Sequence, residues 1–262
     1  MRLSGSVLVP FLLVPITPAQ SVMTSPPRDA SAIALAQSSL AAMGGMNLSP
    51  GQSVAMTGVL NLAGTSLTSF PIVIKTHGTD RLRSELTIAD GVRVTVISGG
   101  AGAIRQPDGR TRQLASENVT GYRNQYLPAL SLLSEFGLPT TSVENLGPTN
   151  VDGSIADVVA LGLWSASPAG SAAQTAQTTR TLFYIDRTTR LVLRMQLLHY
   201  SENVGGTAKK MEIRFSDYRP VQGIQVPFHQ QTYVDGALLI NLQLSAVDLN
   251  AATTDGDFII AQ

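Results

Sequence analysis

The residue types that most often bind metals or carry catalysis are few in this chain. It has no cysteine and three histidines, His77, His199 and His229. Each histidine lies in or beside a predicted strand, and none has a partner at the short strand spacing or the i, i+4 helical spacing of a zinc site. The histidines are therefore interpreted as surface or rim residues, and neither a metal nor another cofactor is expected.

Motifs for hydrolysis and phosphate binding are also missing from the sequence. It contains no G-x-S-x-G turn, and the glycine-rich segment 98–102 lacks the Lys-Ser/Thr of a phosphate loop. The carboxylates show no pair spaced for acid/base catalysis: Glu212, Asp217, Asp235 and Asp248. We expect a protein that is not an enzyme. Because triads assemble in space, an exported hydrolase is kept as a third hypothesis, which needs a serine and a histidine within hydrogen-bond reach.

The composition favours apolar ligands over charged ones. The 18 basic and 18 acidic residues give a net charge of zero, so nucleic acid is not expected as a partner. Charged residues make up 14% of the chain and hydrophobic residues 44%. Large aromatics are scarce, and flexible aliphatic and methionine side chains suit a cavity that adapts to acyl chains. An ordinary packed core is the alternative interpretation of the same residues.

The amino terminus has the pattern of an export signal. Met1-Arg2 precedes the apolar stretch Val7–Ile16, and small residues around Ala19 supply a cleavage site. Two prolines interrupt the apolar stretch, which is about half as long as a bilayer span. Residues 1–19 are predicted to be a signal peptide and 20–28 a flexible tether. The mature protein is then soluble, secreted and periplasmic.

Two helices are predicted. The first begins near Asp29 and ends at Gly44, with an apolar stripe at steps of three and four: Ile33, Ala36, Leu40 and Met43. The second, shorter helix covers Tyr126–Phe136 and is stopped by Gly137. Its apolar stripe consists of Leu130, Leu133 and Phe136. Such a stripe needs a partner surface, so this helix is expected to cover one face of a sheet.

The remainder of the chain alternates with a period of two, which is typical of β-strands. Turns are predicted at 90–91, 107–109, 152–153, 186–189 and 235–236. Residues 164–180 are rich in Ser, Ala, Thr and Gln and are predicted to be a flexible loop. The sum is a mainly β (α+β) fold of about nine to eleven antiparallel strands. Residues 29–262 are predicted to form a single domain.

Short motifs in these elements resemble those of the LolA/LolB-type lipoprotein carriers and their relatives. The motifs are an amphipathic helix ending in Gly-Gly, the arginine-rich strand 80–85, the D-x-x-T turn at Asp186, and the segments Phe215–Arg219 and 223–227. The resemblance covers most of residues 29–250. It implies an unclosed antiparallel β-barrel, covered by an N-terminal and a mid-chain helix, with acyl chains bound between sheet and helices. Arg83 matches the family's strand arginine near the cavity mouth, with Arg81 as the second choice.

This resemblance leads to a functional hypothesis: an exported carrier that holds the acyl chains of a lipid or acylated lipoprotein. The expected ligand-binding residues share an apolar lining or a covering helix: Leu82, Arg83, Leu86, Val94, Leu130, Leu133, Phe136, Leu193, Met195, Ile213 and Phe215. The alternative is a non-enzymatic interaction or sensor protein that uses the same fold to bind an envelope protein partner. A carrier should copurify with lipid, whereas a binding platform should be empty.

Overall fold

The computed structural model describes residues 25–45, 51–64, 69–78, 80–114, 119, 129, 133–164, 180–199 and 208–260. The predicted signal peptide, most of the tether and nearly all of the predicted loop 164–180 lie outside these residues. Within them, no helix is long and apolar enough to span a bilayer.

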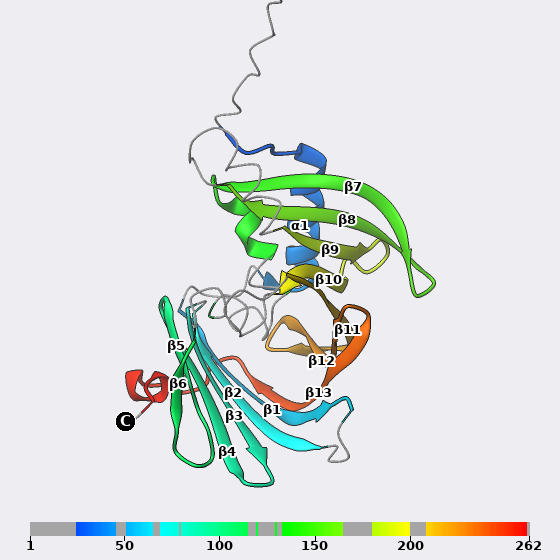
Figure 1. Ribbon diagram of the computed structural model, residues 1–262. Coiled ribbons are helices and arrows are strands. Elements are labelled where there is room, and N and C mark those ends of the chain that lie inside the picture. Colours follow the sequence, from blue (N-terminus) through cyan, green and yellow to red (C-terminus); the bar gives the residue numbers. More distant parts are fainter. Residues whose placement is uncertain are drawn as a thin grey trace, which may run out of the picture.

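The described chain forms one antiparallel sheet of thirteen strands in the order β6-β5-β4-β3-β2-β1-β13-β12-β11-β10-β9-β8-β7 (Figure 1). All neighbours are hairpin partners except β1 and β13, which join the first and last strands of the chain. The strands are β1 Ser53–Leu62, β2 Phe70–His77, β3 Arg81–Ile88, β4 Gly91–Ser98, β5 Ala101–Arg105, β6 Thr111–Gln113, β7 Thr141–Val151, β8 Ser154–Leu163, β9 Thr181–Asp186, β10 Val192–His199, β11 Lys209–Val221, β12 Ile224–Val234 and β13 Ala237–Asp248.

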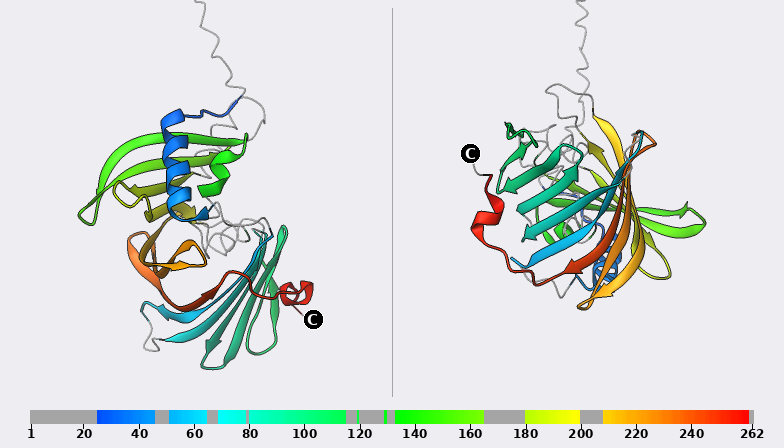
Figure 2. Two further views of the ribbon diagram at one scale, coloured as in Figure 1. Left: turned by 180° about the vertical axis from the view of Figure 1, so that it is seen from behind. Right: turned by 90° about the horizontal axis from the view of Figure 1, so that it is seen from below.

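The sheet curls but does not close, which confirms the predicted unclosed barrel (Figure 2). Its two edges, β6 and β7, are adjacent in sequence but lie at opposite ends of the sheet. The edge strand β7 carries Gly147 with φ +82°, a break in register between Asn145 and Gly147, and then Pro148. A bulge and a proline weaken an edge as a template for further strands. The edge is therefore protected against pairing with other chains.

The tight turns follow the sequence pattern. Asp152 and Gly153 have φ values of +49° and +92°, and Asp235 and Gly236 have +48° and +82°. Two consecutive positive φ angles define the type I′ turn, which matches the twist of antiparallel strands and favours Asp-Gly. The predicted turns at these positions are confirmed. The expectation of nine to eleven strands is too low, because β7 lacks a regular apolar alternation and contains Gly147-Pro148.

Helix α1, Ala30–Ala42, confirms the first predicted helix. The side chain of its N-cap, Asp29, accepts a hydrogen bond from the Ser31 backbone N–H at 2.7 Å, which satisfies one of the free N–H groups of the first turn. Ala36, Leu40 and Met43 are buried, as the stripe predicts, and Ile33 is partly buried. In Figures 1 and 2, α1 lies along the part of the sheet formed by β7–β10.

The end of α1 is held by a close backbone approach. The Gln225 N–H donates to the Met43 carbonyl at 2.9 Å. Gly44 has φ +75°, and a Cβ atom on it would lie 2.0 Å from the Gly223 carbonyl oxygen. Only glycine fits this position, since any side chain would be both strained and in collision. The predicted Gly-Gly stop therefore also docks the helix on the β11–β12 turn.

Most of the predicted second helix lies outside the described residues, and Leu130 with it. Ala129 and Leu133 are described as helical and are buried in the main core. They are followed by the 3₁₀ helix η2, Ser134–Gly137, which ends at the predicted stop. Phe136 packs against the same core. The described end of this segment therefore lies on the sheet face that α1 covers.

Candidate functional site

One face of the curled sheet is apolar across most of its strands, and it is called here the concave face. Register assigns its members: Met56 pairs with Ile74, and Ile213 pairs with Met195. These residues belong to one buried cluster that also contains Ala32, Ala36 and Leu40 of α1 and its C-cap, Met43. The concave face and α1 together thus enclose the largest apolar core of the described chain.

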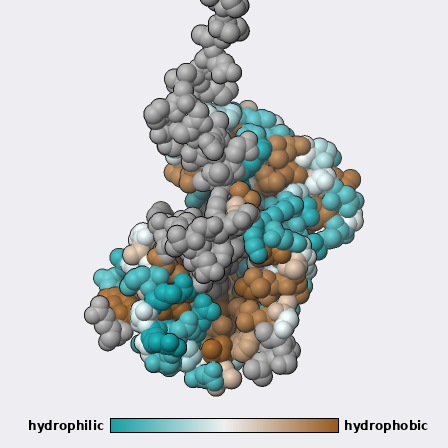
Figure 3. Space-filling view, viewed as in Figure 1, coloured by the Kyte–Doolittle hydropathy of each residue, from teal (hydrophilic) through white to brown (hydrophobic). Residues whose placement is uncertain are grey.

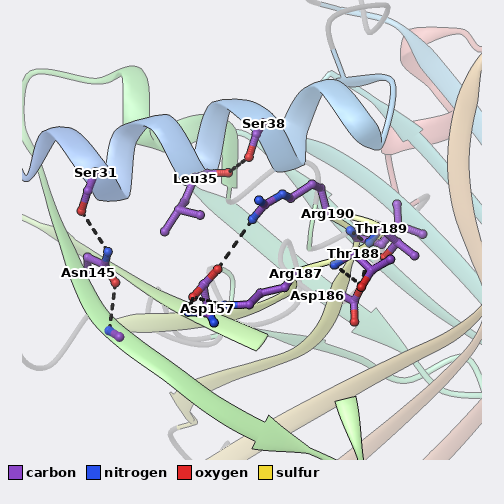
Figure 4. A network of polar contacts seen from close by, with 12 residues as sticks. Ser31, Leu35, Ser38, Asn145, Asp157, Asp186, Arg187, Thr188, Thr189 and Arg190 are labelled. Atoms are coloured by element: carbon purple, nitrogen blue, oxygen red, sulfur yellow. Dashed lines mark hydrogen bonds and ion pairs between the residues drawn. The ribbon is translucent and has the colours of Figure 1, made fainter. Parts of the chain in front are cut away.

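Two sets of polar contacts lie at this end of the concave face, one within the sheet and one between β7 and α1 (Figure 4). Asp157, which faces α1 from β8, accepts hydrogen bonds from Arg187 Nε and Nη2 at 2.9 and 2.8 Å, and Arg190 lies 3.6 Å away. Asn145 on β7 donates to the Ser31 hydroxyl at 2.9 Å. Because carboxylate–guanidinium hydrogen bonds are the stronger kind, this end of the concave face is held rigidly.

The D-x-x-T turn next to this network is built by Asp186. Its Oδ1 accepts from the backbone N–H groups of Thr188 and Thr189, at 2.9 and 2.7 Å, and from the Thr189 hydroxyl at 2.9 Å. Burial alone would raise the pKa of Asp186, but these hydrogen bonds and the charge of Arg190 hold it below its usual value. The motif therefore has a structural role in the β9–β10 turn.

The opposite end of the concave face, at the turns of three hairpins, keeps apolar side chains partly exposed. Ile240 pairs with Leu62 on β1 and with Thr232 on β12. Leu86 pairs with Ile72, and Ile88 ends β3 at the same side. Leu62, Leu86, Ile88 and Ile240 are all partly buried against the main core and are called here the rim residues. Figure 3 shows hydrophobic residues gathered over β1 and β13 in this half.

Four methionines are buried in the core beneath the concave face: Met43, Met56, Met195 and Met211. Methionine is unbranched and adapts its shape to irregular space. Beside η2, a small recess of about 20 Å³ is lined by Leu161, Phe183 and Thr141 among others. Pockets that hold drug-sized ligands span roughly 300–1,000 Å³. A long acyl chain would therefore need the concave face to rearrange, which its methionines favour.

The structure brings most of the predicted site residues to the concave side. Leu86, Leu133, Phe136, Met195, Ile213 and Phe215 all belong to or pack against the main core. Leu82 lies on the same face by its pairing with Thr76, but in a separate small cluster with Ile97 and Ile104. Whether these residues bind a ligand stays a prediction.

Val94 lies on the other face, and its place among the lining residues is corrected. The two-residue turn between β3 and β4 pairs Ile88 with Gly91. Each even-numbered residue of one strand is therefore paired with an odd-numbered residue of the other, and paired residues lie on the same face of the sheet. Val94 therefore pairs with Glu85, and it packs against Phe258 on the outer side. Residues of the same parity on two strands joined by such a turn point to opposite faces.

Leu193 is also displaced from the concave face. The register shifts between Val192 and Arg194, where β10 pairs with β9. Leu193 falls in this bulge and packs against the outer cluster that contains Val158 and Tyr184. One extra residue in a strand changes which side chains point inward. The alternation of Leu191, Leu193, Met195 and Leu197 in the sequence gives no sign of this shift.

Arg83 points away from the concave face as well, so the position near a cavity mouth that the resemblance implies does not fit it. Its Nε donates to Glu85 at 2.6 Å and its Nη1 to the Asp257 carbonyl at 3.2 Å. Arg81 pairs with Asp255 in the same C-terminal 3₁₀ helix, η3, Asp255–Phe258. The arginine-rich strand therefore anchors the C-terminal segment on the outer side.

Lys75 completes this anchor by an ion pair with Asp257 at 2.7 Å. The hydrogen bond that Lys75 donates, together with one from the Thr254 backbone N–H, lowers the pKa of Asp257 to about 2.

The outer face of β9–β12 carries a polar ladder instead of an apolar lining. Glu212 accepts from Arg214 Nε at 2.6 Å and from Gln196 Nε2 at 2.8 Å. Arg194 stacks 3.9 Å from the Tyr184 ring centroid, and the Tyr184 hydroxyl donates to Gln196 at 2.9 Å. Burial opposes the charge on Glu212, but these donors and the nearby guanidinium groups hold its pKa below the usual range.

Two serine–histidine contacts meet the geometric condition of the hydrolase hypothesis. Ser216 Oγ lies 2.8 Å from His229 Nδ1, and His229 Nε2 lies 2.6 Å from Asn241 Oδ1. Ser53 Oγ lies 2.8 Å from His77 Nδ1. Ser216 and His229 are direct partners in the β11–β12 ladder, and Ser53 and His77 in the β1–β2 ladder. Strand pairing alone therefore accounts for both contacts.

Among the described residues, no group of three or more His, Cys, Asp or Glu could hold a metal ion. The residues predicted for the site do not include the rim residues Leu62, Ile88 and Ile240, nor Gln230, which is buried on β12. Ile240 could have been found from the sequence, because Leu238, Ile240, Leu242 and Leu244 alternate with a period of two. Gln230 stood in a polar stretch, Gln230-Gln231-Thr232, that gave no sign of its burial.

No family model matches the chain, and no curated protein is similar to it in sequence. Solved structures match its fold along nearly their whole length. A Vibrio parahaemolyticus domain described as an outer-membrane lipoprotein-sorting protein is 13% identical, with a TM-score of 0.58, covering 86% of this chain and 95% of its own. A LolA superfamily protein from Nitrosomonas europaea is 14% identical, with a TM-score of 0.54, and the match covers 86% of this chain and 97% of that protein. A DUF1329 family protein from Desulfovibrio piger is 15% identical, with a TM-score of 0.55, and the match covers 89% of this chain and 98% of that protein.

These identities are too low to establish a shared activity, but the match in architecture is extensive. This chain has a LolA-like fold.

Proposed function

We propose that the protein is an exported carrier that binds acyl chains of a lipid or lipoprotein along the concave face. The observation that carries the proposal is the apolar character of that face, from the core under α1 to the partly exposed rim residues. Monomeric proteins seldom keep apolar side chains clustered at an opening unless something binds there. The Vibrio parahaemolyticus domain of similar fold is described as a lipoprotein-sorting protein, which supports the proposal.

The driving force in this proposal is the hydrophobic effect. Burial stabilises by about 0.8 kcal/mol per methylene. An acyl chain of about 16 carbons therefore gains on the order of 10 kcal/mol before the costs of ordering the chain and rearranging the protein. The methionines of the concave face lower the second cost because they change conformation without losing contact.

Release needs a competing acceptor or a movement that opens the concave face. An envelope acceptor with a similar apolar site fulfils the first condition. In that case the protein passes its acyl cargo to that acceptor, as the carrier hypothesis requires.

The first test is native mass spectrometry, with organic extraction, of the mature protein purified from an envelope-containing host. We expect copurified lipid or acylated peptide. An empty, folded protein that pulls down an envelope protein would instead support the interaction or sensor hypothesis, and it would overturn the carrier proposal.

A matched pair of variants tests the location of the site. Ile240→Glu places a charge among the rim residues, whereas Leu239→Glu places it one residue away on an exposed position of the same strand. We expect Ile240→Glu to reduce uptake of a fluorescent acyl lipid at least ten-fold and Leu239→Glu to change it less than two-fold, because a buried charge without a partner is costly. Equal effects of both variants would contradict the rim as the entrance.

A further inference from the structure

One polar side chain lies inside the apolar lining of the concave face. Gln230 on β12 is directly opposite Phe215 on β11 and Leu242 on β13. The same row continues through Leu60 to Phe70. Gln230 is 4% exposed, as deeply buried as its apolar neighbours. An amide therefore stands alone in a row of five residues of which the other four are hydrocarbon or aromatic.

The amide of Gln230 has no partner for its donor. Its Nε2 atom is buried and makes no hydrogen bond. Glutamine carries two N–H donors on this nitrogen, and buried polar groups are almost always paired in folded proteins. The other buried glutamine on these strands, Gln196, is paired on both sides, with Tyr184 and Glu212. The unpaired donor of Gln230 is thus a local exception that a bound ligand would resolve.

The surroundings define the chemistry of the missing acceptor. Phe215, Leu242, Leu60 and Phe70 supply no positive charge to this row. A phosphate or carboxylate oxygen at this depth would bring an unpaired charge into an apolar environment, which is strongly unfavourable. A neutral carbonyl oxygen accepts the hydrogen bond without that cost. The complementary group is therefore an ester or amide carbonyl.

The depth of Gln230 agrees with the anatomy of an acyl lipid. The row of Ile240, Leu62 and Thr232 is the next one toward the hairpin turns. Two residues along a strand span about 7 Å, so Gln230 lies about that far inside the rim. Ester carbonyls adjoin the polar end of a lipid, and the acyl chains extend beyond them. Deeper along β12, Val226 and Ile224 line the core near α1.

We propose that Gln230 donates a hydrogen bond from Nε2 to an ester or amide carbonyl of the bound acyl ligand. The inference rests on the proposed function and specifies its substrate class: acyl-linked lipids or lipoproteins are preferred over ether-linked or plain hydrocarbon chains. Gln230 is thus a specificity-determining residue of the concave site.

The test compares a diacyl and a dialkyl-ether phosphatidylcholine of equal chain length as competitors of a fluorescent fatty-acid probe. Wild-type protein should prefer the diacyl lipid about two- to ten-fold, the range of one hydrogen bond. Gln230→Met should remove this preference, so that the diacyl and the ether lipid compete equally well. Gln231→Met, the same change on the next residue of β12, should keep the preference.

The outcomes separate the two proposals. If wild-type protein binds neither lipid, the proposed function fails. If it binds both equally, or if Gln230→Met keeps the preference, only the role of Gln230 is overturned. Infrared spectroscopy of a lipid labelled with ¹³C at its ester carbonyl gives a second measurement. The carbonyl stretch of the bound lipid should lie at higher frequency in Gln230→Met than in wild type, and an unchanged frequency would refute the hydrogen bond.

Discussion

The two ends of the concave face are built from the same aliphatic residue types, yet they differ in how they are covered. Under α1, Ile185 and Phe183 are completely buried, and Asn145 of β7 donates a hydrogen bond to Ser31 of the helix. At the hairpin turns, Ile240 and Leu86 remain partly exposed. The covered end therefore stabilises the fold, and the rim is the part of the face where we propose that a ligand enters. The same apolar face thus combines a structural core with a proposed binding site.

The strongest test of this comparison is the same truncation at both ends. Ile185→Ala should lower the free energy of unfolding by about 2–5 kcal/mol, because it leaves a cavity in a packed core. Ile240→Ala should cost about 1 kcal/mol, since part of its side chain is already in water. Urea unfolding measures both values. Equal losses would mean that the rim is as much a part of the core as the covered end.

A second test loosens the cover itself. Gly44→Ala strains a left-handed backbone position and pushes a Cβ against the Gly223 carbonyl, so we expect a loss of about 3 kcal/mol. Gly109 also has a positive φ, +86°, but an added Cβ there meets open space. Gly109→Ala should therefore cost only the backbone strain, about 1–2 kcal/mol. Thermal unfolding distinguishes the two, and similar losses would show that α1 tolerates a shift of its end.

The smallest change in stability is expected on the outer face of the sheet, at Glu212 of β11. Folding lowers the pKa of Glu212, so the unfolded state binds this proton more tightly than the native state. The carboxylate then contributes stability above its unfolded pKa, about 4.3, and this contribution is lost as the pH falls through its native value. Glu212→Gln should cost about 1 kcal/mol at pH 7 and flatten the decline in stability toward pH 3.

The measurement is the urea midpoint of wild type and Glu212→Gln between pH 7 and pH 3. Acyl-lipid uptake per folded molecule should not change in this variant, because Glu212 lies on the face opposite to the proposed site. An uptake defect would show that the outer ladder and the concave face are coupled.

Local sequence signals predicted much of the architecture. The Asp-Gly turns, the N-cap Asp29 and the Gly44 stop act over a few residues, and each lies where its pattern indicates. Strand β7 was missed because Gly147 and Pro148 resemble a loop, although at a sheet edge they protect against further pairing. Residues that the candidate site needs were harder to predict, because their role depends on which face they occupy.

Periodicity and turn chemistry are enough to predict the antiparallel hairpins and the amphipathic first helix from the residues alone, and the composition gives the predominance of flexible aliphatic side chains. The joining of β1 to β13, the outward direction of Arg83 and Val94, the displacement of Leu193 and the burial of Gln230 arise only in the folded chain. The physical reason is the two-residue period of a strand: a single bulge or a change of register exchanges its faces, and long-range pairing alone fixes that register.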